Sequence, residues 1–390
     1  MLVGNLFTQF ASNLSQVAKM VNIMSALLSA FTILFLFWTI THLTKKLVLK
    51  NDEQTNTFAQ TLIVIGSGLV GALTYTFSDT FWYSAVEGEV YAFSSMLTAL
   101  VFWLILKWEE NADKPHSEKW LVLIAYIMGL SIGVHLLNLL CIPAIALVYY
   151  FRKSKETSWK GVLNAILISF GLILILMYGI IPGFTKVGGW FELFFVNTLG
   201  LSYNSGVLVY FIILTASIAW TLYETFKENI NFKRAKLAFI TSLALSGILF
   251  IGSSIWLWVL IIVVAAYFIF RKENTNIKLI NLASSCLLVI LIGFSAYLLI
   301  PIRSSANPPL DLNSPEDVFS LGSYLNREQY GDTPLIYGQT YASQIERDGN
   351  GTAIYKTKKQ YERAVKTSAD QKDKYIVKDA VDSYKFNNTM

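Results

Sequence analysis

One polar segment between two apolar stretches, residues 78–95 (SDTFWYSAVEGEVYAFSS), carries the carboxylates Asp79, Glu87 and Glu89 and no basic residue. Its aromatic residues are Phe81, Trp82, Tyr83, Tyr91 and Phe93. A carboxylate can act as a general base or bind a metal ion, and an aromatic face beside it can pack on a sugar ring. The same residues also suit a structural role, because acidic side chains favour helix N-termini and Trp and Tyr gather at membrane interfaces. Both interpretations are open from this segment alone.

A second polar pair, His135 and Asn138, interrupts the apolar run GLSIGVHLLNLLCIPA at residues 129–144. Non-helical backbone at membrane depth is tolerated mainly where it lines a polar cavity. A neutral histidine and an amide can hold a phosphate oxygen or a sugar hydroxyl. They can equally cap a broken helix, and the residue types do not separate the two roles.

The third candidate region follows the last apolar stretch. Arg303 comes directly after it, where a guanidinium can pair bidentately with the phosphate of a lipid carrier or simply extend to the headgroups. Arg327 and Tyr330 belong to a polar cluster further along, which a solvated loop would also explain. Residues 182–206 form an aromatic-rich segment that predicts either one wall of a lipid-substrate groove or an interfacial helix.

The composition indicates which elements must position these side chains. Of the 390 residues, 54% are hydrophobic and 15% are charged, and the mean hydropathy is +0.49, values that soluble domains do not reach. A spanning helix needs about 20 apolar residues, so the chain predicts an all-α polytopic membrane protein with about ten transmembrane helices. The expected spans are residues 21–42, 58–77, 88–106, 119–134, 136–151, 161–181, 206–225, 236–252, 255–270 and 279–300. Two overlong apolar stretches are divided at GVHLLN (133–138) and at GSSI (252–255).

Basic residues fall in alternate loops, which the positive-inside rule assigns to the cytoplasmic side. These residues are Lys45, Lys46, Lys50, Lys107, Lys114, Lys119, Arg152, Lys153, Lys155, Lys160, Lys227, Lys233, Arg234, Lys236, Arg271, Lys272 and Lys278. The intervening loops carry only Lys186. We therefore expect a transmembrane domain over residues 1–300, a soluble extracytoplasmic segment over residues 301–390, and both ends of the chain on the periplasmic side of a bacterial inner membrane.

Several other classes of function lack their signatures. Cys141 and Cys286 lie singly in apolar runs, so neither a disulfide framework nor a cysteine metal site is indicated, and we expect no metal. There is no P-loop, no Gly-x-Ser-x-Gly and no HExxH. Almost no ionisable residue stands at the centre of an expected span, which argues against an ion-coupled transporter. All polar candidates lie on the outward side, which suits an enzyme that uses a lipid-linked donor.

Three segments resemble one known family. FWYSAVEGEVYAFSSMLTALVFWLILKWE, GLSIGVHLLNLLCIPA and IRSSANPPLDLNSPEDVFSLGSYLNREQYGDTPLIYGQTY are similar, in the same order, to a bacterial family of multi-spanning proteins. That family is related to the eukaryotic transmembrane O-mannosyltransferase that modifies IPT domains of plexins and receptor kinases. It belongs to the GT-C glycosyltransferase superfamily. The resemblance extends along the whole chain and is more specific for the family than for an activity.

The resemblance implies a GT-C-like bundle with an outward-facing active site, a polyprenyl-phosphate sugar as donor substrate and a protein Ser or Thr hydroxyl as acceptor. A carboxylate would take the acceptor proton during a single inverting displacement, and Arg303 and His135 would stabilise the leaving phosphate. Glu87 and Glu89 match the family's acidic loop by position. The implied partners are the lipid-linked sugar donor, a periplasmic acceptor protein and membrane lipids; no nucleic acid is expected.

The chain departs from the family at its start. Full-length members begin with an additional span and an outward loop with an Asp-Gly-Glu-type motif, where the GT-C pattern places its principal carboxylate. This chain begins at MLVGNLFTQF, after that point. We therefore expect a chain truncated at both ends, with Glu87, Glu89 and Asp79 in auxiliary catalytic roles. We expect Asn138, Arg327, Tyr330, Trp82 and Tyr83 to help bind the donor phosphate or sugar.

Two alternatives from other classes remain open. A lipid-linked saccharide flippase or other transporter would retain its function after Glu87→Gln and Glu89→Gln. A non-catalytic scaffold for an envelope assembly would tolerate those changes together with Arg303→Ala and would still bind a partner. The acidic loop beside aromatic residues and the outward soluble segment favour the glycosyltransferase.

Overall fold

The structure is a computed structural model that describes residues 2–49, 57–271, 276–330, 338–368, 370–387 and 389. Lys50 and Lys272, two of the basic loop residues named above, lie outside the described residues. The described chain is mostly helical and divides into two compact units. Unit 1 comprises Met1–Ile173 and Leu282–Ala296, and unit 2 comprises Leu174–Asn281 and Tyr297–Met390.

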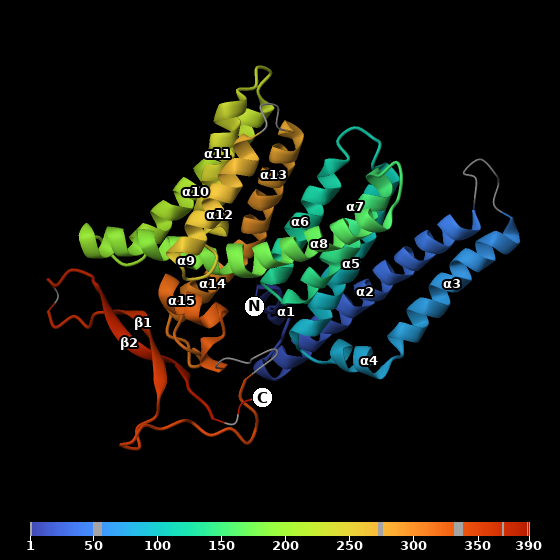
Figure 1. Ribbon diagram of the computed structural model, residues 1–390. Helices are drawn as coiled ribbons and strands as arrows, with labels where there is room; N and C mark the ends of the chain where they lie inside the picture. The colour runs from blue at the N-terminus through green and yellow to red at the C-terminus, as the bar shows by residue number, and fades with distance from the viewer. Residues whose placement is uncertain are drawn as a thin grey trace. The chain divides into compact units, whose positions relative to one another are not determined.

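Among the described residues, all regular elements of unit 1 are helices, and turns or short loops join them. Figure 1 labels the longer ones. In order they are α1 (Leu2–Thr8), η1 (Leu14–Gln16), α2 (Val17–Val48), α3 (Phe58–Thr76), α4 (Asp79–Val86), α5 (Val90–Asn111), α6 (Glu118–Ile132), η2 (Leu136–Cys141), α7 (Ile142–Lys153) and α8 (Trp159–Leu174), the last residue of which belongs to unit 2. Most of α13 (Ile277–Phe294) also belongs to unit 1. Helix α2 packs along both α3 and α5, which makes it the central helix of this unit.

Unit 2 combines helices with a small antiparallel sheet. Its elements are η3 (Ile175–Ile180), α9 (Ile181–Leu193), η4 (Phe194–Thr198), α10 (Ser205–Phe226), α11 (Phe232–Leu245), η5 (Ile248–Phe250), α12 (Ile255–Phe270), α14 (Leu299–Ser304), α15 (Val318–Leu325), η7 (Glu328–Tyr330), β1 (Tyr355–Arg363) and β2 (Tyr375–Tyr384), and η6 (Ser295–Leu298) begins in unit 1. Strands β1 and β2 pair antiparallel, with Tyr355 opposite Tyr384 and Arg363 opposite Tyr375. This hairpin (red in Figure 1) is not among the predicted elements, although it lies in the segment expected to be soluble.

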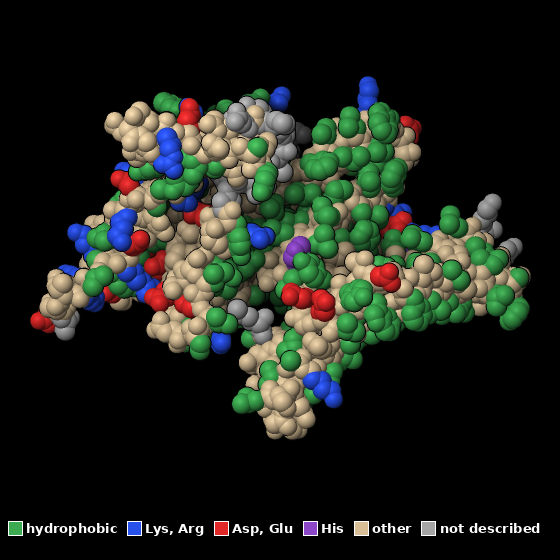
Figure 2. All heavy atoms as spheres, turned by 90° about the horizontal axis from the view of Figure 1, so that it is seen from below, with side chains coloured by type: hydrophobic (Ala, Val, Ile, Leu, Met, Phe, Trp, Pro, Cys, Tyr) green, Lys and Arg blue, Asp and Glu red, His purple; other side chains and the backbone are tan. Residues whose placement is uncertain are grey.

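The prediction of a polytopic α-helical membrane protein is confirmed. Seven helices among the described residues are long and apolar enough to cross a membrane: Leu14–Val48, Phe58–Thr76, Val90–Asn111, Leu136–Lys153, Trp159–Thr198, Ser205–Phe226 and Ile277–Ser304. The other three expected spans coincide with shorter helices, α6 of 15 residues, α11 of 14 and α12 of 16. Figure 2 shows many hydrophobic side chains, in green, on the surface of one face, as expected for helices that contact lipid.

Both predicted interruptions of the long apolar stretches are present. Helix α6 ends at Ile132 and η2 begins at Leu136, so the first stretch is broken at the predicted residues. Helix α11 ends at Leu245, the short η5 follows, and α12 begins only at Ile255. Residues 182–206, predicted as a wall of a lipid-substrate groove or an interfacial helix, include α9, whose buried residues include Phe184, Val187 and Glu192. Helix α9 packs against α10 and α15 within unit 2.

Unit 1 has two chemically different ends. At one end, which we call the paired end, Lys46 pairs with Glu109, and His42 Nδ1 lies 3.1 Å from Glu110 Oε1. Arg152 pairs with Asp113 at the same end, and Lys153 Nζ donates to the Ala112 carbonyl at 2.8 Å. The basic residues of three predicted cytoplasmic loops therefore lie together. Helix α5 has 22 residues, so its other end lies about 33 Å away.

Candidate functional site

The opposite end of unit 1 holds the candidate residues, and we call it the acidic end, defined by Asp79, Glu87, Glu89, Tyr91 and His135. Asp79 is the first residue of α4, Glu87 follows its last residue, and Glu89 directly precedes α5. The three carboxylates are exposed. Within the described residues, no hydrogen bond or ion pair involves their side chains. They therefore remain available to a ligand.

The three carboxylates differ in how well a structural role explains them. Asp79 lies in the first turn of α4, where the helix dipole favours a negative charge. Glu89 occupies the N-cap of α5, but its side chain accepts no hydrogen bond from the first turn. Glu87 stands at the C-terminal end of α4, where the dipole disfavours a carboxylate. The helix dipole therefore accounts for Asp79 and also favours a charge at Glu89, while it leaves Glu87 unexplained.

Gly88 fixes the position of the two glutamates on either side of it. A Cβ atom at Gly88 would lie 3.0 Å from Val21 Cγ1 and 3.1 Å from Asn22 Oδ1, both at the start of α2. Such a close approach leaves little room for any side chain. The loop from Glu87 to Glu89 is therefore seated against the beginning of the central helix, although the sequence provides no pattern that identifies this contact.

His135 lies at the break between α6 and η2 and is joined to the acidic end through Tyr91. The centroids of the two rings are 5.8 Å apart, with an angle of 52° between their planes. The backbone N–H of Leu137 donates to His135 Nδ1 at 3.1 Å, so Nδ1 caps the short helix η2. In a neutral imidazole the proton then resides on Nε2, for which no acceptor is found among the described residues. His135 can thus cap the break and also offer a hydrogen bond.

A close crossing of two helices holds the end of α6 in place. A Cβ atom at Gly129 would lie 2.6 Å from the Ile290 carbonyl oxygen, and one at Gly293 would lie 2.4 Å from the Leu130 nitrogen. Only glycine allows the backbones of α6 and α13 to approach in this way. Since His135 follows Gly129 by less than two turns of helix, this crossing also positions the imidazole.

Asn138 is placed differently from the other candidates. Its side chain is 1% exposed, and neither Nδ2 nor Oδ1 has a hydrogen-bond partner among the described residues. A buried amide without a partner is unfavourable by about 1–3 kcal/mol, so such groups usually bind water or a polar ligand. Asn138, three residues after His135 in η2, is therefore a buried polar position suited to bind water or a polar ligand.

The predicted aromatic residues of this end present open faces. Trp82 is 51% exposed and stacks on Phe77 with 6.0 Å between the ring centroids, and Tyr83 is 66% exposed. Phe81 is buried and packs against Tyr75, with the centroids 4.4 Å apart. Rings that are supported on one side and open on the other can pack against a sugar or an acyl chain. Phe81 instead anchors α4.

The remaining predicted residues belong to unit 2. Arg303 is exposed in the last turn of α14, and no hydrogen bond or ion pair of its side chain is found in the described part of the chain. Arg327 places its guanidinium 4.9 Å from the centre of the Tyr330 ring, so these two exposed residues do contact one another. Arg327 also adopts a φ of 57°, in the left-handed region. Both arginines retain charge that an anionic ligand can use.

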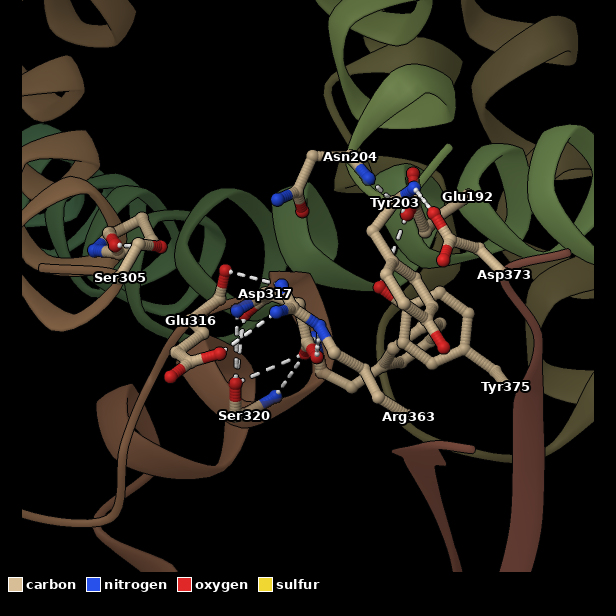
Figure 3. A network of polar contacts seen from close by, with 12 residues as sticks. Glu192, Tyr203, Asn204, Ser305, Glu316, Asp317, Ser320, Arg363, Asp373 and Tyr375 are labelled. Carbon is tan, nitrogen blue, oxygen red and sulfur yellow. Dashed lines mark hydrogen bonds and ion pairs between the residues drawn. The ribbon is translucent and has the colours of Figure 1, made fainter. Parts of the chain in front are cut away.

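Unit 2 also contains a polar network that the sequence does not predict, shown in Figure 3. Glu192 is completely buried, and its Oε1 accepts from the Asn204 N–H at 2.6 Å and from the Tyr375 hydroxyl at 3.1 Å. Its Oε2 accepts from the Val207 N–H at 3.2 Å. These four residues, the Glu192 network, join α9, the N-terminus of α10 and strand β2. A single glutamate within an aromatic run is a weak signal that does not identify its partners.

A second set of contacts reinforces the same junction. Arg363 pairs with Glu316 at 2.8 Å and with Asp317 at 3.3 Å. Tyr375 exchanges two backbone hydrogen bonds with the side chain of Asn197, at 2.9 Å and 2.7 Å. Burial and the nearby carboxylates of Asp317 and Glu192 raise the pKa of Tyr375, so its hydroxyl stays a donor. These contacts hold the β-hairpin in unit 2.

The comparisons with known proteins concern unit 1. Residues 1–158 match the family model described as the protein O-mannosyl-transferase TMEM260 N-terminal domain. The matched residues include Asp79, Glu87, Glu89, His135 and Asn138, whereas Arg303, Arg327 and Tyr330 lie beyond them. No curated protein and no solved structure matches the chain. The N-terminal part of the chain is therefore related to the eukaryotic O-mannosyltransferase.

Proposed function

We propose that this protein is a membrane glycosyltransferase of the GT-C type. It transfers a sugar, mannose or one like it, from a polyprenyl phosphate to a Ser or Thr hydroxyl of a protein. The observation that carries the proposal is the match of residues 1–158 to the O-mannosyltransferase N-terminal domain. The acidic end supports it, because two exposed glutamates, whose side chains have no hydrogen-bond partner among the described residues, lie within the matched residues.

The proposed side of the membrane follows from the two ends of unit 1. The basic residues Lys46, Arg152 and Lys153 gather at the paired end, which the positive-inside rule assigns to the cytoplasm. The acidic end then faces outward, toward the periplasm if the membrane is a bacterial inner membrane. Donor and acceptor would meet at that surface.

The proposed reaction is a single displacement with inversion. A carboxylate accepts the proton of the acceptor hydroxyl as its oxygen forms a bond to the anomeric carbon. The bond from that carbon to the phosphate oxygen breaks, and the lipid phosphate departs with the electron pair. The Nε2–H of His135 would donate to the developing phosphate charge. Glu87 and Glu89 act as auxiliary carboxylates at this site.

The test is sugar transfer by membranes of cells in which the native gene is edited. With polyprenyl-phosphate [³H]mannose as donor, Glu89→Gln should lower the label on protein at least about tenfold, a loss of roughly 1.4 kcal/mol of transition-state stabilisation. Glu118→Gln is the matched control, because Glu118 is an exposed glutamate that begins α6, at the far end of α5. Undiminished transfer by Glu89→Gln would remove Glu89 from the site.

Transfer that is absent from wild-type membranes would contradict the proposed activity itself. A flippase would instead move the labelled lipid across the membrane of sealed vesicles without labelling protein. Both readouts come from one preparation, so the two functions separate in a single experiment.

A further inference from the structure

A lysine in unit 2 is held at a second helix crossing that plays no part in the proposed reaction. A Cβ atom at Gly183 would lie 2.7 Å from Gly247 Cα, so α9 and the turn before η5 touch through their backbones. Gly247 adopts a φ of 85°, which glycine alone adopts without strain. One turn beyond Gly183 stands Lys186, and three residues beyond Gly247 stands Phe250. The crossing therefore places Lys186 next to Phe250, the last residue of η5.

The ammonium group of Lys186 is surrounded by electron-rich groups that carry no net charge. Its Nζ donates to the carbonyl of Phe250 at 3.0 Å and also to the carbonyl of Gly252. It lies 5.0 Å from the centre of the Trp258 ring. Trp190, Phe250 and Trp258 pack against one another, with centroids 5.0 to 5.7 Å apart. The lysine is therefore oriented by two dipoles and an aromatic face.

The positive charge has no counter-ion within the described residues, since none of the ion pairs found there includes Lys186. A lysine ammonium has three N–H donors, and two carbonyls occupy two of them. The side chain is partly exposed, so the third donor has a route to the surface. A fixed cation with a spare donor and no acidic partner is arranged to bind an anion.

The surroundings indicate which anion can reach it. None of the residues of α12 is buried, and at its start Ile255 is 63% exposed and Trp256 is 80% exposed. Tryptophan concentrates at the headgroup level of membranes, where one side of the ring is apolar and the other is wet. Lys186 thus contacts Trp258 of α12, an apolar helix without buried residues whose exposed first turn is of the kind expected at the headgroup level.

We propose that Lys186, with the carbonyls of Phe250 and Gly252 and the ring of Trp258, forms a binding site for the phosphate group of an anionic membrane lipid, in preference to a lipid such as phosphatidylcholine whose phosphate charge is neutralised by its own headgroup. The phosphate accepts the third N–H of the ammonium and supplies its missing counter-charge, and the lipid chains lie along α12. An anionic phospholipid and a polyprenyl phosphate share this chemistry. The inference is independent of the proposed function, and it deepens that function if the polyprenyl phosphate is the occupant.

The first test uses the unmodified protein. Reconstituted in phosphatidylcholine nanodiscs, the protein is treated briefly with an amine-acetylating reagent, and acetylation of individual lysines is measured by mass spectrometry. Adding phosphatidylglycerol or undecaprenyl phosphate should slow acetylation of Lys186 at least about threefold, the protection given by a ligand at twice its Kd. Lys278, an exposed lysine in the first turn of α13, is the internal control.

Each outcome is decisive. Protection by undecaprenyl phosphate alone identifies the carrier lipid, and protection by both lipids identifies a general headgroup site. Lys186 acetylated at the same rate with either lipid as in phosphatidylcholine alone would overturn the proposal and leave Lys186 as a clamp on the helix break. Because the readout does not involve sugar transfer, this failure is distinct from a failure of the proposed function.

Two substitutions provide an independent measurement. Lys186→Gln keeps an N–H donor for the carbonyls but removes the charge, whereas Lys186→Arg keeps the charge. Native mass spectrometry of the purified protein should show at least about tenfold weaker retention of the added lipid for the first variant, or roughly 1.4 kcal/mol, and a smaller change for the second. Lys278→Gln should retain the lipid as the wild type does. Equal retention by Lys186→Gln would contradict the site.

Discussion

The acidic end of unit 1 and the Glu192 network of unit 2 use similar residues for opposite purposes. Both place carboxylates beside aromatic rings, but Glu192 is buried and accepts three hydrogen bonds, while Glu87 and Glu89 are exposed and accept none among the described residues. A carboxylate whose acceptor positions are filled by the protein stabilises the fold. One whose positions are open can take a proton or bind a ligand.

The largest contrast is expected from the same substitution in both regions. Glu192→Ala leaves the N–H groups of Asn204 and Val207 and the hydroxyl of Tyr375 without their acceptor, so unfolding should become easier by roughly 3–5 kcal/mol. Glu87→Ala removes an exposed side chain without partners and should change stability by less than about 0.5 kcal/mol. Thermal unfolding in detergent, followed by the loss of helical circular dichroism, measures both. Equal destabilisation by the two variants would show that the acidic end is also a structural network.

A second contrast concerns two glycines of unit 1. Gly129→Ala places a Cβ atom 2.6 Å from the Ile290 carbonyl oxygen, so α6 and α13 must separate, at about 1–3 kcal/mol of stability. Gly171→Ala in α8 meets nothing within 4 Å and should be neutral or slightly stabilising. His135 follows the end of α6 by three residues, so a shift of α6 also moves the imidazole. Gly129→Ala should therefore lower sugar transfer as well, whereas Gly171→Ala should leave it unchanged. A Gly129→Ala protein with wild-type melting and transfer would show that the crossing does not position the site.

A smaller effect is expected at the histidine. His135→Ala removes the Nε2–H donor proposed for the departing phosphate and should lower kcat about tenfold, or roughly 1.4 kcal/mol. The cap on η2 is lost at the same time, so His135→Asn serves as a second variant that keeps a capping acceptor. His116→Ala, in the exposed loop before α6, is the matched control. Restored kcat in His135→Asn would assign His135 to capping alone.

The contrast between the two regions also explains what could be predicted from the sequence. Spans and their interruptions depend on apolar runs and local breaks, so the first break follows α6 at the predicted residues, and α12 begins at Ile255 as expected. Helix α11, however, ends at Leu245, seven residues before the predicted second interruption. The acidic loop was identifiable because its residue types are unusual between two spans. Whether the candidate residues act in catalysis stays a prediction.

Contacts between residues distant in the chain could not be predicted. Glu192 and Tyr375 are separated by 183 positions, and no local pattern signals that they meet. Similarly, the Tyr91 and His135 rings meet only because α5 and α6 run antiparallel. The hairpin was missed because a two-stranded sheet in a polar segment leaves only a weak alternation, and the predicted domain boundary at residue 300 stays a prediction.

The smallest expected effect is a pH dependence confined to unit 2. The hydrogen bond from Lys366 lowers the pKa of Asp373, helped by the Tyr203 N–H at 2.9 Å and opposed by partial burial. Since the pKa is lower in the folded state, the contact stabilises the hairpin above the ordinary aspartate value of about 3.9 and is lost as the pH falls through the folded pKa. The protection factors of the β2 amides, which correct for the intrinsic pH dependence of exchange, should therefore fall below about pH 4. Asp373→Asn should remove this response, while the exchange at the acidic end of unit 1 stays the same in both proteins; a β2 response that persists in Asp373→Asn would assign the acid sensitivity to another group.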